Sequence, residues 1–431
     1  MLDTLPNELL LDIAKCLFTH RDINALARTN RHLFSLVDPY LYRSNPHESS
    51  SLALSWAAKH GRVETARKAI ERGASGACRV LKKGSCTWKG YGKSGNSPGC
   101  TPLFQAIVEG CDEVVKLLLE LPTTDVNHHG LYSRTPLFWA VKRSHYSITE
   151  LLLTCDGIRP DEVDENGSTP LSYAAEVDDN AAVDILLGSD KVDADWRNAF
   201  GRTPLSLAAE EGNVISAWQL LDSGKVDPDS GDYKGQTPFS WAAKRCQFEM
   251  VMFLLDSGKI KPDSRDGRGR TPLFHAIQEA PLPYSNNEKV IQAILDLDEV
   301  DPDAADEDGM TPLACAAKSG NSTGVQLLLD TNKVNPTRTD RNGLTPLHHA
   351  AYMGQTEIIR LLLSRDDVDP NTPDNDSCPP LTHATMGGHK VIVEELLRSK
   401  KITDIDPRDV NGRTPLWWAV GTTISLWARQ L

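Results

Sequence analysis

The sequence has no long apolar run and no excess of positive charge. No apolar stretch approaches the roughly 20 residues that span a bilayer. The first residues, MLDTLPNELLLDIAKCLF, contain no basic segment and are interrupted by Asn7, Glu8 and Asp12, so they do not form a signal peptide. The formal net charge of -13 would repel a phosphate backbone. We therefore expect neither a membrane nor a nucleic acid as the main partner.

The cysteines are few and do not occur in closely spaced pairs. The nine cysteines occur singly, and Cys78, Cys86 and Cys100 lack the paired spacing of a zinc site. An odd number of cysteines in a chain without a signal peptide is typical of reduced thiols. The sequence therefore predicts a cytoplasmic or nuclear protein with no metal site.

Motifs that carry chemistry are missing as well. A literal G-x-G-x-x-G at Gly90, Gly92 and Gly95 leads into Pro98 and Gly99 rather than into a helix, so it does not predict a dinucleotide site. No HExxH motif occurs, and no nucleophile, base and orienting group can be placed together from the sequence. We expect no catalytic residue and no cofactor, and we predict that the protein is not an enzyme.

What the sequence has in abundance is an internal repeat. The tripeptide TPL, or a close variant, begins at residues 101, 135, 169, 203, 237, 271, 311, 345, 379 and 414, and a degenerate copy begins at Leu52. Typical copies read DYKGQTPFSWAAK from Asp232 and DRNGLTPLHHAAYMG from Asp340. This pattern and its period resemble ankyrin repeats, and the resemblance covers residues 52–431.

Each part of the repeated motif has a physical reason. A glycine two places before the Thr tolerates the positive φ of a turn, the Thr can cap a helix, and Pro suits the first helical position. Small pairs such as Ala242 and Ala243 allow helices to approach closely. The second helix carries an apolar face that only stacked neighbours can cover. We predict an all-α repeat solenoid, an ankyrin stack of helix-turn-helix units with short β-hairpin loops.

The first residues form a separate module. Residues 4–43 resemble an F-box, a short helical module that docks onto the Skp-type adaptor of a cullin ubiquitin ligase. Its residues Leu9, Ile13 and Leu17 recur at helical spacing, and so small a piece buries little core by itself. The tryptophan that F-boxes often carry in the last helix is absent here. The resemblance implies an adaptor contact through Leu5, Pro6, Leu9, Leu10 and Ile13. The alternative is that these helices only cap the array.

We therefore predict three parts along the chain. These are an F-box-like helical module at residues 1–44, a short linker at 45–51, and an ankyrin array of about 11 copies at 52–431. The first copy is degenerate and carries an insertion at 76–98, residues 280–287 lengthen the loop between the two helices of another copy, and the last copy is truncated. Because each copy contacts only its neighbours, we expect an elongated monomer.

A second set of residues is expected to bind a protein target. In the ankyrin family, the hairpin tips and the concave side of the first helices form the usual contact surface, and aromatic and Arg residues are common interface anchors. By this resemblance the exposed tips include Leu131, Tyr132, Arg134, Phe200, Arg202, Tyr233 and Lys234. Two of the first helices are expected to end in basic pairs on the same side of the array. These pairs are Lys142 with Arg143 and Lys244 with Arg245. The alternative is that these residues are ordinary solvent-exposed side chains without a binding role. If the target binds elsewhere, the basic insertion at 76–98 is the next candidate for the binding surface.

A further aromatic series recurs four places after the Thr of each motif. It comprises Trp56, Trp139, Tyr173, Trp241, His275, His349, His383 and Trp418. The identical register favours packing between repeats over a binding stripe. We interpret His348, one place earlier, as a local hydrogen-bonding group and not as a catalytic base.

Together these patterns predict a protein-binding adaptor. The leading hypothesis is the substrate receptor of a Skp–cullin–F-box ubiquitin ligase, with the adaptor on the N-terminal helices and an unknown protein target on the ankyrin face. The alternative is an ankyrin scaffold or inhibitor with no link to ubiquitin.

Overall fold

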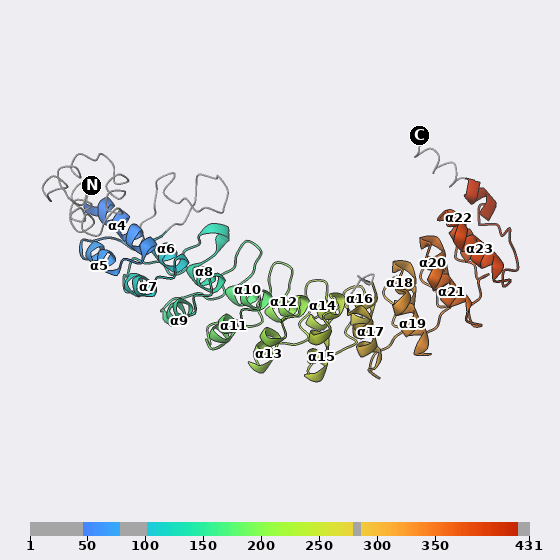
Figure 1. Cartoon of the computed structure of the whole chain (residues 1–431), viewed down its shortest axis with the longest axis horizontal. Coiled ribbons are helices and arrows are strands. Elements are labelled where there is room, and N and C mark those ends of the chain that lie inside the picture. Colours follow the sequence, from blue (N-terminus) through green and yellow to red (C-terminus); the bar gives the residue numbers. More distant parts are fainter. Residues whose placement is uncertain (1–45, 78–100, 279–285, 421–431) are drawn as a thin grey trace, which may run out of the picture. The chain divides into compact units, whose positions relative to one another are not determined.

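The structure, a computed structural model, describes residues 46–77, 101–278 and 286–420. Within these ranges the labelled elements are 20 α-helices and one 3-10 helix, η2 (Leu131–Ser133), a further helical stretch lies at 415–420, and there is no strand. The first helices of the repeats are α4 (Pro46–His60), α6 (Pro102–Val108), α8 (Pro136–Lys142), α10 (Pro170–Glu176), α12 (Pro204–Glu211), α14 (Pro238–Lys244), α16 (Pro272–Gln278), α18 (Pro312–Ser319), α20 (Pro346–Met353) and α22 (Pro380–Met386). The second helices are α5 (Val63–Glu71), α7 (Asp112–Leu119), α9 (Tyr146–Thr154), α11 (Asn180–Leu187), α13 (Val214–Asp222), α15 (Phe248–Asp256), α17 (Asn287–Leu295), α19 (Ser322–Asp330), α21 (Thr356–Leu363) and α23 (Lys390–Arg398). The predicted helical repeat fold is confirmed (Figure 1).

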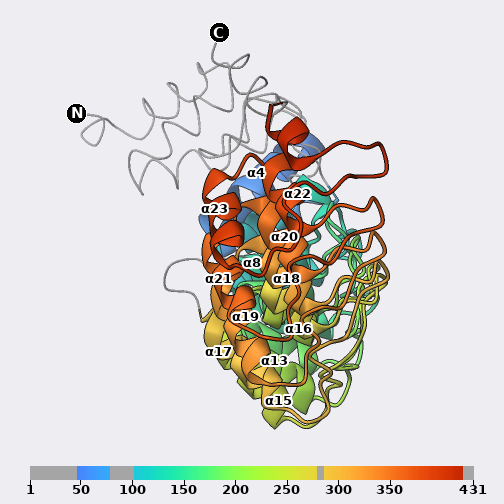
Figure 2. The same ribbon diagram turned by 90° about the vertical axis from the view of Figure 1, so that its right-hand side faces the viewer.

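The helices divide between two compact units. The first holds residues up to 174 together with 179–199, and the second holds 175–178 together with the residues from 200 onward. In the first unit α4, α6 and α8 make contact in order, as do α5, α7, α9 and α11. In the second unit the first helices α12 to α22 contact in the same way, and so do the second helices α13 to α23. Figure 2 shows the loops of these later repeats gathered along one side of the helices.

Two predicted boundaries can be compared with the helices. Helix α4 begins at Pro46, so it covers most of the stretch predicted as a linker at 45–51. The insertion at 280–287 falls between α16 and α17, the two helices of one repeat, as predicted. The F-box-like module and nearly all of the insertion at 76–98 lie outside the described residues, while the last copy shows a helix over 415–420.

The start of each first helix is set by the Thr-Pro pair. In α14 the Oγ1 atom of Thr237 accepts the N–H of Ser240 at 3.2 Å, and Pro238 occupies the first turn. The same bond caps the first helices that follow Thr101, Thr135, Thr169, Thr203, Thr271, Thr311 and Thr345. Where Pro379 replaces the Thr, the helix has no side-chain cap. The predicted capping role is therefore confirmed.

Most turns before the first helices place a glycine at positive φ, while Ser133 and Ser377 take this position in two of them. Gly235 has a φ of +78°, and the turn closes through the N–H of Gly235 to the carbonyl of Asp232 at 2.8 Å and the N–H of Asp232 to the carbonyl of Gln236 at 3.0 Å. A Cβ at Gly235 would lie 2.9 Å from the backbone nitrogen of Gly267 in the next repeat. The hairpin turns therefore form as predicted, although their flanks do not become strands in the described residues.

The core lies between the two helices of each repeat and their neighbours. In one repeat Ala242 and Ala243 of α14 are fully buried, as are Met250, Val251 and Leu254 of α15. The alanines allow the helices to approach, and the apolar stripe of α15 is shielded from water by adjacent repeats. Burial of this stripe holds the turn tips and the ends of the first helices in a fixed register.

Candidate functional site

The turn tips of the second unit expose two aromatic rings in successive repeats. Phe200 is 63 % exposed and Tyr233 is 73 % exposed. The N–H of Tyr233 donates to the carbonyl of Phe200 at 3.2 Å, so the tips of successive repeats are joined through their backbones. Lys234 follows and is also exposed. These three side chains are placed as the sequence predicts, at tips open to a partner.

A buried ring in the same unit lies close to two cations. The guanidinium carbon of Arg202 lies 3.7 Å from the ring centroid of Trp241, and the Nζ atom of Lys244 lies 4.7 Å from it. Trp241 is buried and donates its Nε1–H to Asp232 at 3.3 Å. Such contacts orient long basic side chains that would otherwise move freely in water.

Glu210 links the cations of two repeats. Its side chain, at the end of α12, is bonded by Arg202 from the same repeat and by Arg245 from the next, with Arg245 Nη2 at 2.6 Å and Nε at 3.1 Å. Glu210 is only 7 % exposed, so the pairing takes place largely out of water. Glu210 was not among the residues predicted from the sequence. The available signal was its register, because it stands seven places after its Thr, as Lys142 and Lys244 do.

The first unit carries a related cluster of different charge. The guanidinium of Arg134 bonds Asp164 at 2.9 Å and lies 4.6 Å from the ring centroid of Phe138. The Nζ atom of Lys142 lies 5.8 Å from the centroid of Trp139 and 5.3 Å from that of Tyr173. Burial lowers the pKa of Lys142, and the nearby Arg134 and Arg143 lower it further.

Three of the predicted tip residues are less exposed than expected. The side chains of Arg134 and Arg202 are 13 % and 22 % exposed, and Leu131 in η2 is half-buried. Each Arg stands just before its capping Thr, and its guanidinium turns back over an aromatic ring toward an acidic partner instead of extending into water. By contrast Tyr132 is 39 % exposed and Arg143 and Arg245 are exposed, as predicted.

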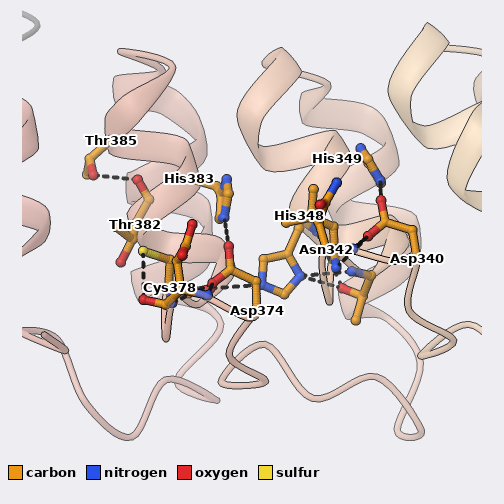
Figure 3. A network of polar contacts seen from close by, with 12 residues as sticks. Asp340, Asn342, His348, His349, Asp374, Cys378, Thr382, His383 and Thr385 are labelled. Atoms are coloured by element: carbon orange, nitrogen blue, oxygen red, sulfur yellow. Dashed lines mark hydrogen bonds and ion pairs between the residues drawn. The ribbon is translucent and has the colours of Figure 1, made fainter. Parts of the chain in front are cut away.

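The aromatic series four places after each Thr packs between repeats. Trp139, Trp241, His275 and His349 are buried, and Trp139 meets Phe104 of the preceding repeat edge-on with ring centroids 5.5 Å apart. In the later repeats a histidine replaces the indole and bonds an aspartate nine places earlier. The His349–Asp340 and His383–Asp374 pairs are shown in Figure 3, with nitrogen–oxygen distances of 3.0 and 2.7 Å. The expected packing role is borne out by this geometry.

His348 bridges two repeats as a neutral ring. Its Nδ1 accepts the N–H of Thr345 at 3.1 Å, so the proton sits on Nε2, which donates to the carbonyl of Cys378 at 3.1 Å (Figure 3). Burial, with the neighbouring His383, lowers the pKa of His348 to about 4. The ring has the local hydrogen-bonding role that the sequence predicts.

Comparison with known families decides what this stack is. A family model for ankyrin repeats matches overlapping segments that together run from residue 54 to residue 374, well over half of the chain. The chain belongs to the ankyrin-repeat family. Ahead of the ankyrin repeats, an F-box-like family model matches residues 2–45. Both families are protein-interaction modules, so the domain content of the chain fits a protein-binding adaptor. No curated protein matches the sequence.

The remaining predicted sites can be placed only in part. The expected adaptor contacts Leu5, Pro6, Leu9, Leu10 and Ile13 lie outside the described residues. Among the residues that the structure does describe, no helix is long and apolar enough to cross a membrane. In the same part of the chain, no group of three or more His, Cys, Asp or Glu side chains is placed to hold a metal ion.

Proposed function

We propose that this ankyrin-repeat protein is the substrate receptor of a Skp–cullin–F-box ubiquitin ligase. The observation that carries the proposal is the order of the two families, with an F-box-like module at residues 2–45 and ankyrin repeats directly after it. The module would hold a Skp-type adaptor through Leu5, Pro6, Leu9, Leu10 and Ile13. The ligase chemistry then belongs to other subunits of the complex.

The ankyrin face would hold the protein to be modified. Exposed rings at the turn tips and cations fixed over buried rings supply the two residue types that dominate protein interfaces. The tip rings Phe200 and Tyr233 stand beside Lys234, and Arg245 lies at the end of α14 in the same unit.

Affinity purification of the full chain with mass spectrometry tests the ligase link. We expect a Skp-type adaptor and a cullin to be recovered with the unmodified chain. Leu9→Asp combined with Ile13→Asp should abolish their recovery, because two carboxylates would then stand on the apolar stripe of the first helix. Asn7→Asp combined with Lys15→Asp, off that stripe, is the matched control and should leave recovery intact.

The opposite result supports the alternative function. If neither adaptor nor cullin is recovered with the unmodified chain while other proteins are, the chain is an ankyrin scaffold or inhibitor outside the ubiquitin system. Circular dichroism of both double variants checks that the ankyrin array remains folded, so that loss of recovery reports on the module alone.

A further inference from the structure

Two successive turns of the second unit expose cations at their tips. Lys234 and Arg268 stand three places before Thr237 and Thr271, and both side chains are exposed. The backbone N–H of Gly267 donates to the carbonyl of Lys234 at 2.7 Å, which joins the two tips. In the part of the chain that the structure describes, neither cation has an ion-pair partner. Both charges are therefore open to a ligand.

The aspartates of the same two turns are buried. Asp232 accepts the backbone N–H of Lys234 at 2.8 Å and the indole N–H of Trp241 at 3.3 Å. Asp266 is bonded by the guanidinium of Arg270 at 2.8 and 3.0 Å. Because both carboxylates are buried and already bonded within the chain, the exposed charge at these two tips is positive.

The sign of the charge changes at the following tip. Its exposed side chains are the acidic Glu307 and Asp308, and the N–H of Glu307 donates to the carbonyl of Arg268 at 2.8 Å. Asp308 pairs with Arg341 at 3.3 Å, and within the described ranges no ion pair joins Glu307 to Arg268. A charged ligand along the tips would therefore meet two cations and then carboxylates, which limits the register in which it can lie.

An exposed aromatic ring stands beside the first of these cations. Tyr233 is 73 % exposed and directly precedes Lys234. A Cβ at Gly201 would lie only 2.7 Å from the Cδ1 atom of Tyr233, so the ring rests against the preceding turn. A ring that is already positioned loses less conformational freedom on binding, and tyrosine is among the residues that most often anchor an interface.

We propose that a tip strip of Tyr233, Lys234 and Arg268 binds an extended acidic segment of the target, which rests on the proposed role of the ankyrin face in target binding. An apolar side chain of the segment lies on the Tyr233 ring, and its carboxylates pair with the two cations. Charge complementarity selects the acidic ligand, because these cations have no partner within the chain. A net charge of -13 disfavours a long polyanion such as nucleic acid, so a short acidic stretch of a protein fits better.

Fluorescence anisotropy with the full chain tests the inference. The probe is a fluorescein-labelled Glu-rich peptide with one central Leu, and its counterpart has Gln in place of every Glu. The Lys234→Glu, Arg268→Glu variant replaces two attractions by two repulsions. We expect it to bind the Glu peptide roughly tenfold more weakly or less, since each exposed pair contributes modestly and reversal counts twice. The unmodified chain should bind the Gln peptide more weakly than the Glu peptide.

Lys289→Glu combined with Lys390→Glu is the matched control. Both lysines are exposed, they lie in the first turns of α17 and α23, and their reversal changes the net charge by the same amount. The control should therefore bind the Glu peptide within about twofold of the unmodified chain, because long-range repulsion alone is screened by salt. Thermal melting verifies that each variant is folded.

A ring variant tests the apolar contact. Tyr233→Ala should weaken binding of the Glu peptide with its central Leu more than binding of a version with Gly in place of that Leu. An equal effect on the two peptides overturns the placement of the apolar side chain on this ring.

Three results would overturn the tip strip as the acidic site. They are equal binding of the Glu peptide by the reversal and control variants, equal binding of the Glu and Gln peptides by the unmodified chain, and no measurable binding of the Glu peptide. The first of these would direct attention to the basic insertion at 76–98.

Failure of this inference is distinguishable from failure of the ligase proposal. Recovery of the Skp-type adaptor is proposed to depend on residues 2–45, and capture of the peptide on Lys234 and Arg268. If the adaptor is not recovered while peptide binding still requires the two cations, the ligase role fails and the acidic-target inference stands. If the adaptor is recovered and the reversal has no effect on the peptide, the inference alone fails.

Discussion

The repeats that begin at Thr237 and Thr345 use one framework position in two ways. Trp241 and His349 are both buried, and each bonds the turn aspartate nine places earlier, Asp232 at 3.3 Å and Asp340 at 3.0 Å. Around Trp241, however, Arg202 and Lys244 supply cations, whereas the residues at the corresponding positions around His349 are Met310 and Tyr352.

This difference distinguishes residues that pack the array from residues that only some repeats carry. A ring bonded to the turn aspartate recurs in both repeats, so it belongs to the packing of the array. The cations and the exposed tip rings occur at only some repeats, so packing does not require them. We infer that the repeats with cations are the ones that hold a target.

Truncating the two framework rings should give the largest effects on stability. Trp241→Ala should lower the free energy of unfolding by about 3–5 kcal/mol, because it leaves a large cavity and an unpaired Asp232 oxygen. His349→Ala should cost about 1–3 kcal/mol, mainly from the loss of a partner for buried Asp340. Urea denaturation of both variants measures the two values. Equal losses would show that the indole contributes no more packing than the imidazole.

Acidification should destabilise the repeats that carry histidines more than the repeats that carry Trp241 and its neighbours. The pKa of His348 is lowered to about 4 in the folded chain from an ordinary value near 6.5, so its contribution to stability is present above pH 6.5 and is lost as pH falls through 4. The loss should reach about 2–3 kcal/mol by pH 4. Hydrogen exchange read peptide by peptide should show α20 and α22 opening before α12 and α14. Uniform opening of these helices would contradict this account.

Removing the tip rings should affect binding far more than stability. A triple variant with Tyr132, Phe200 and Tyr233 changed to Ala should lose about 2 kcal/mol or more of target binding. Its thermal stability should change by only about 0.5 kcal/mol, because these rings are exposed. Capture of the target per folded molecule, beside a melting curve, separates the two effects. If the array melts and capture persists, the rings support the fold and the face lies elsewhere.

Serine occupies the glycine position in two turns, at Ser133 and Ser377, and Ser377 allows a test with a smaller expected effect. Ser377 has a φ of +62°, where Gly235 and other turn glycines have similar values. Because a left-handed backbone strains any residue with a Cβ, Ser377→Gly should stabilise the array by about 1 kcal/mol. The reverse change, Gly235→Ser, should destabilise it, since its Cβ would lie 2.9 Å from Gly267 N. Thermal melts with shifts of the opposite sign would refute the role of these turns.

The smallest effect concerns one acid of the first unit. Burial raises the pKa of Asp161 to about 6, and its Oδ1 atom is buried without a hydrogen-bond partner. Its raised pKa means that stability is gained as pH falls through 6, opposite to His348. At the same register Asn371 donates to the carbonyl of Lys401 at 2.9 Å. Asp161→Asn should therefore raise stability at pH 7.5 by roughly 1 kcal/mol or less, after allowance for solvent screening. Melting curves at pH 7.5 and 5 test this, and a pH-independent difference would contradict it.

Local patterns in the sequence are enough to predict the repeat itself. Thr237 caps its helix and Gly235 adopts positive φ because both roles depend only on residues close by in the chain. The rings in the register of Trp241 and His349 are likewise recognised by their period. These features repeat many times, and repetition distinguishes them from chance.

The details of the candidate surface depend on contacts that one repeat alone does not reveal. Arg202 was expected at an exposed tip but lies over Trp241, since its direction is decided by a ring in the following repeat. Glu210 was missed because its partners Arg202 and Arg245 stand 8 and 35 residues away. The register of Glu210, seven places after Thr203, is the sequence signal that would have identified it.

Reciprocal capture tests the central claim that one chain joins an adaptor to a target through separate surfaces. The full chain is purified from cells as the unmodified form, as the Leu9→Asp, Ile13→Asp variant and as the Tyr132, Phe200, Tyr233 triple Ala variant, with bound proteins quantified by mass spectrometry. We predict that the first variant loses the adaptor and cullin but keeps the target, and that the second loses the target but keeps the adaptor and cullin. Loss of both sets of proteins from either folded variant, or loss of neither, would contradict the account.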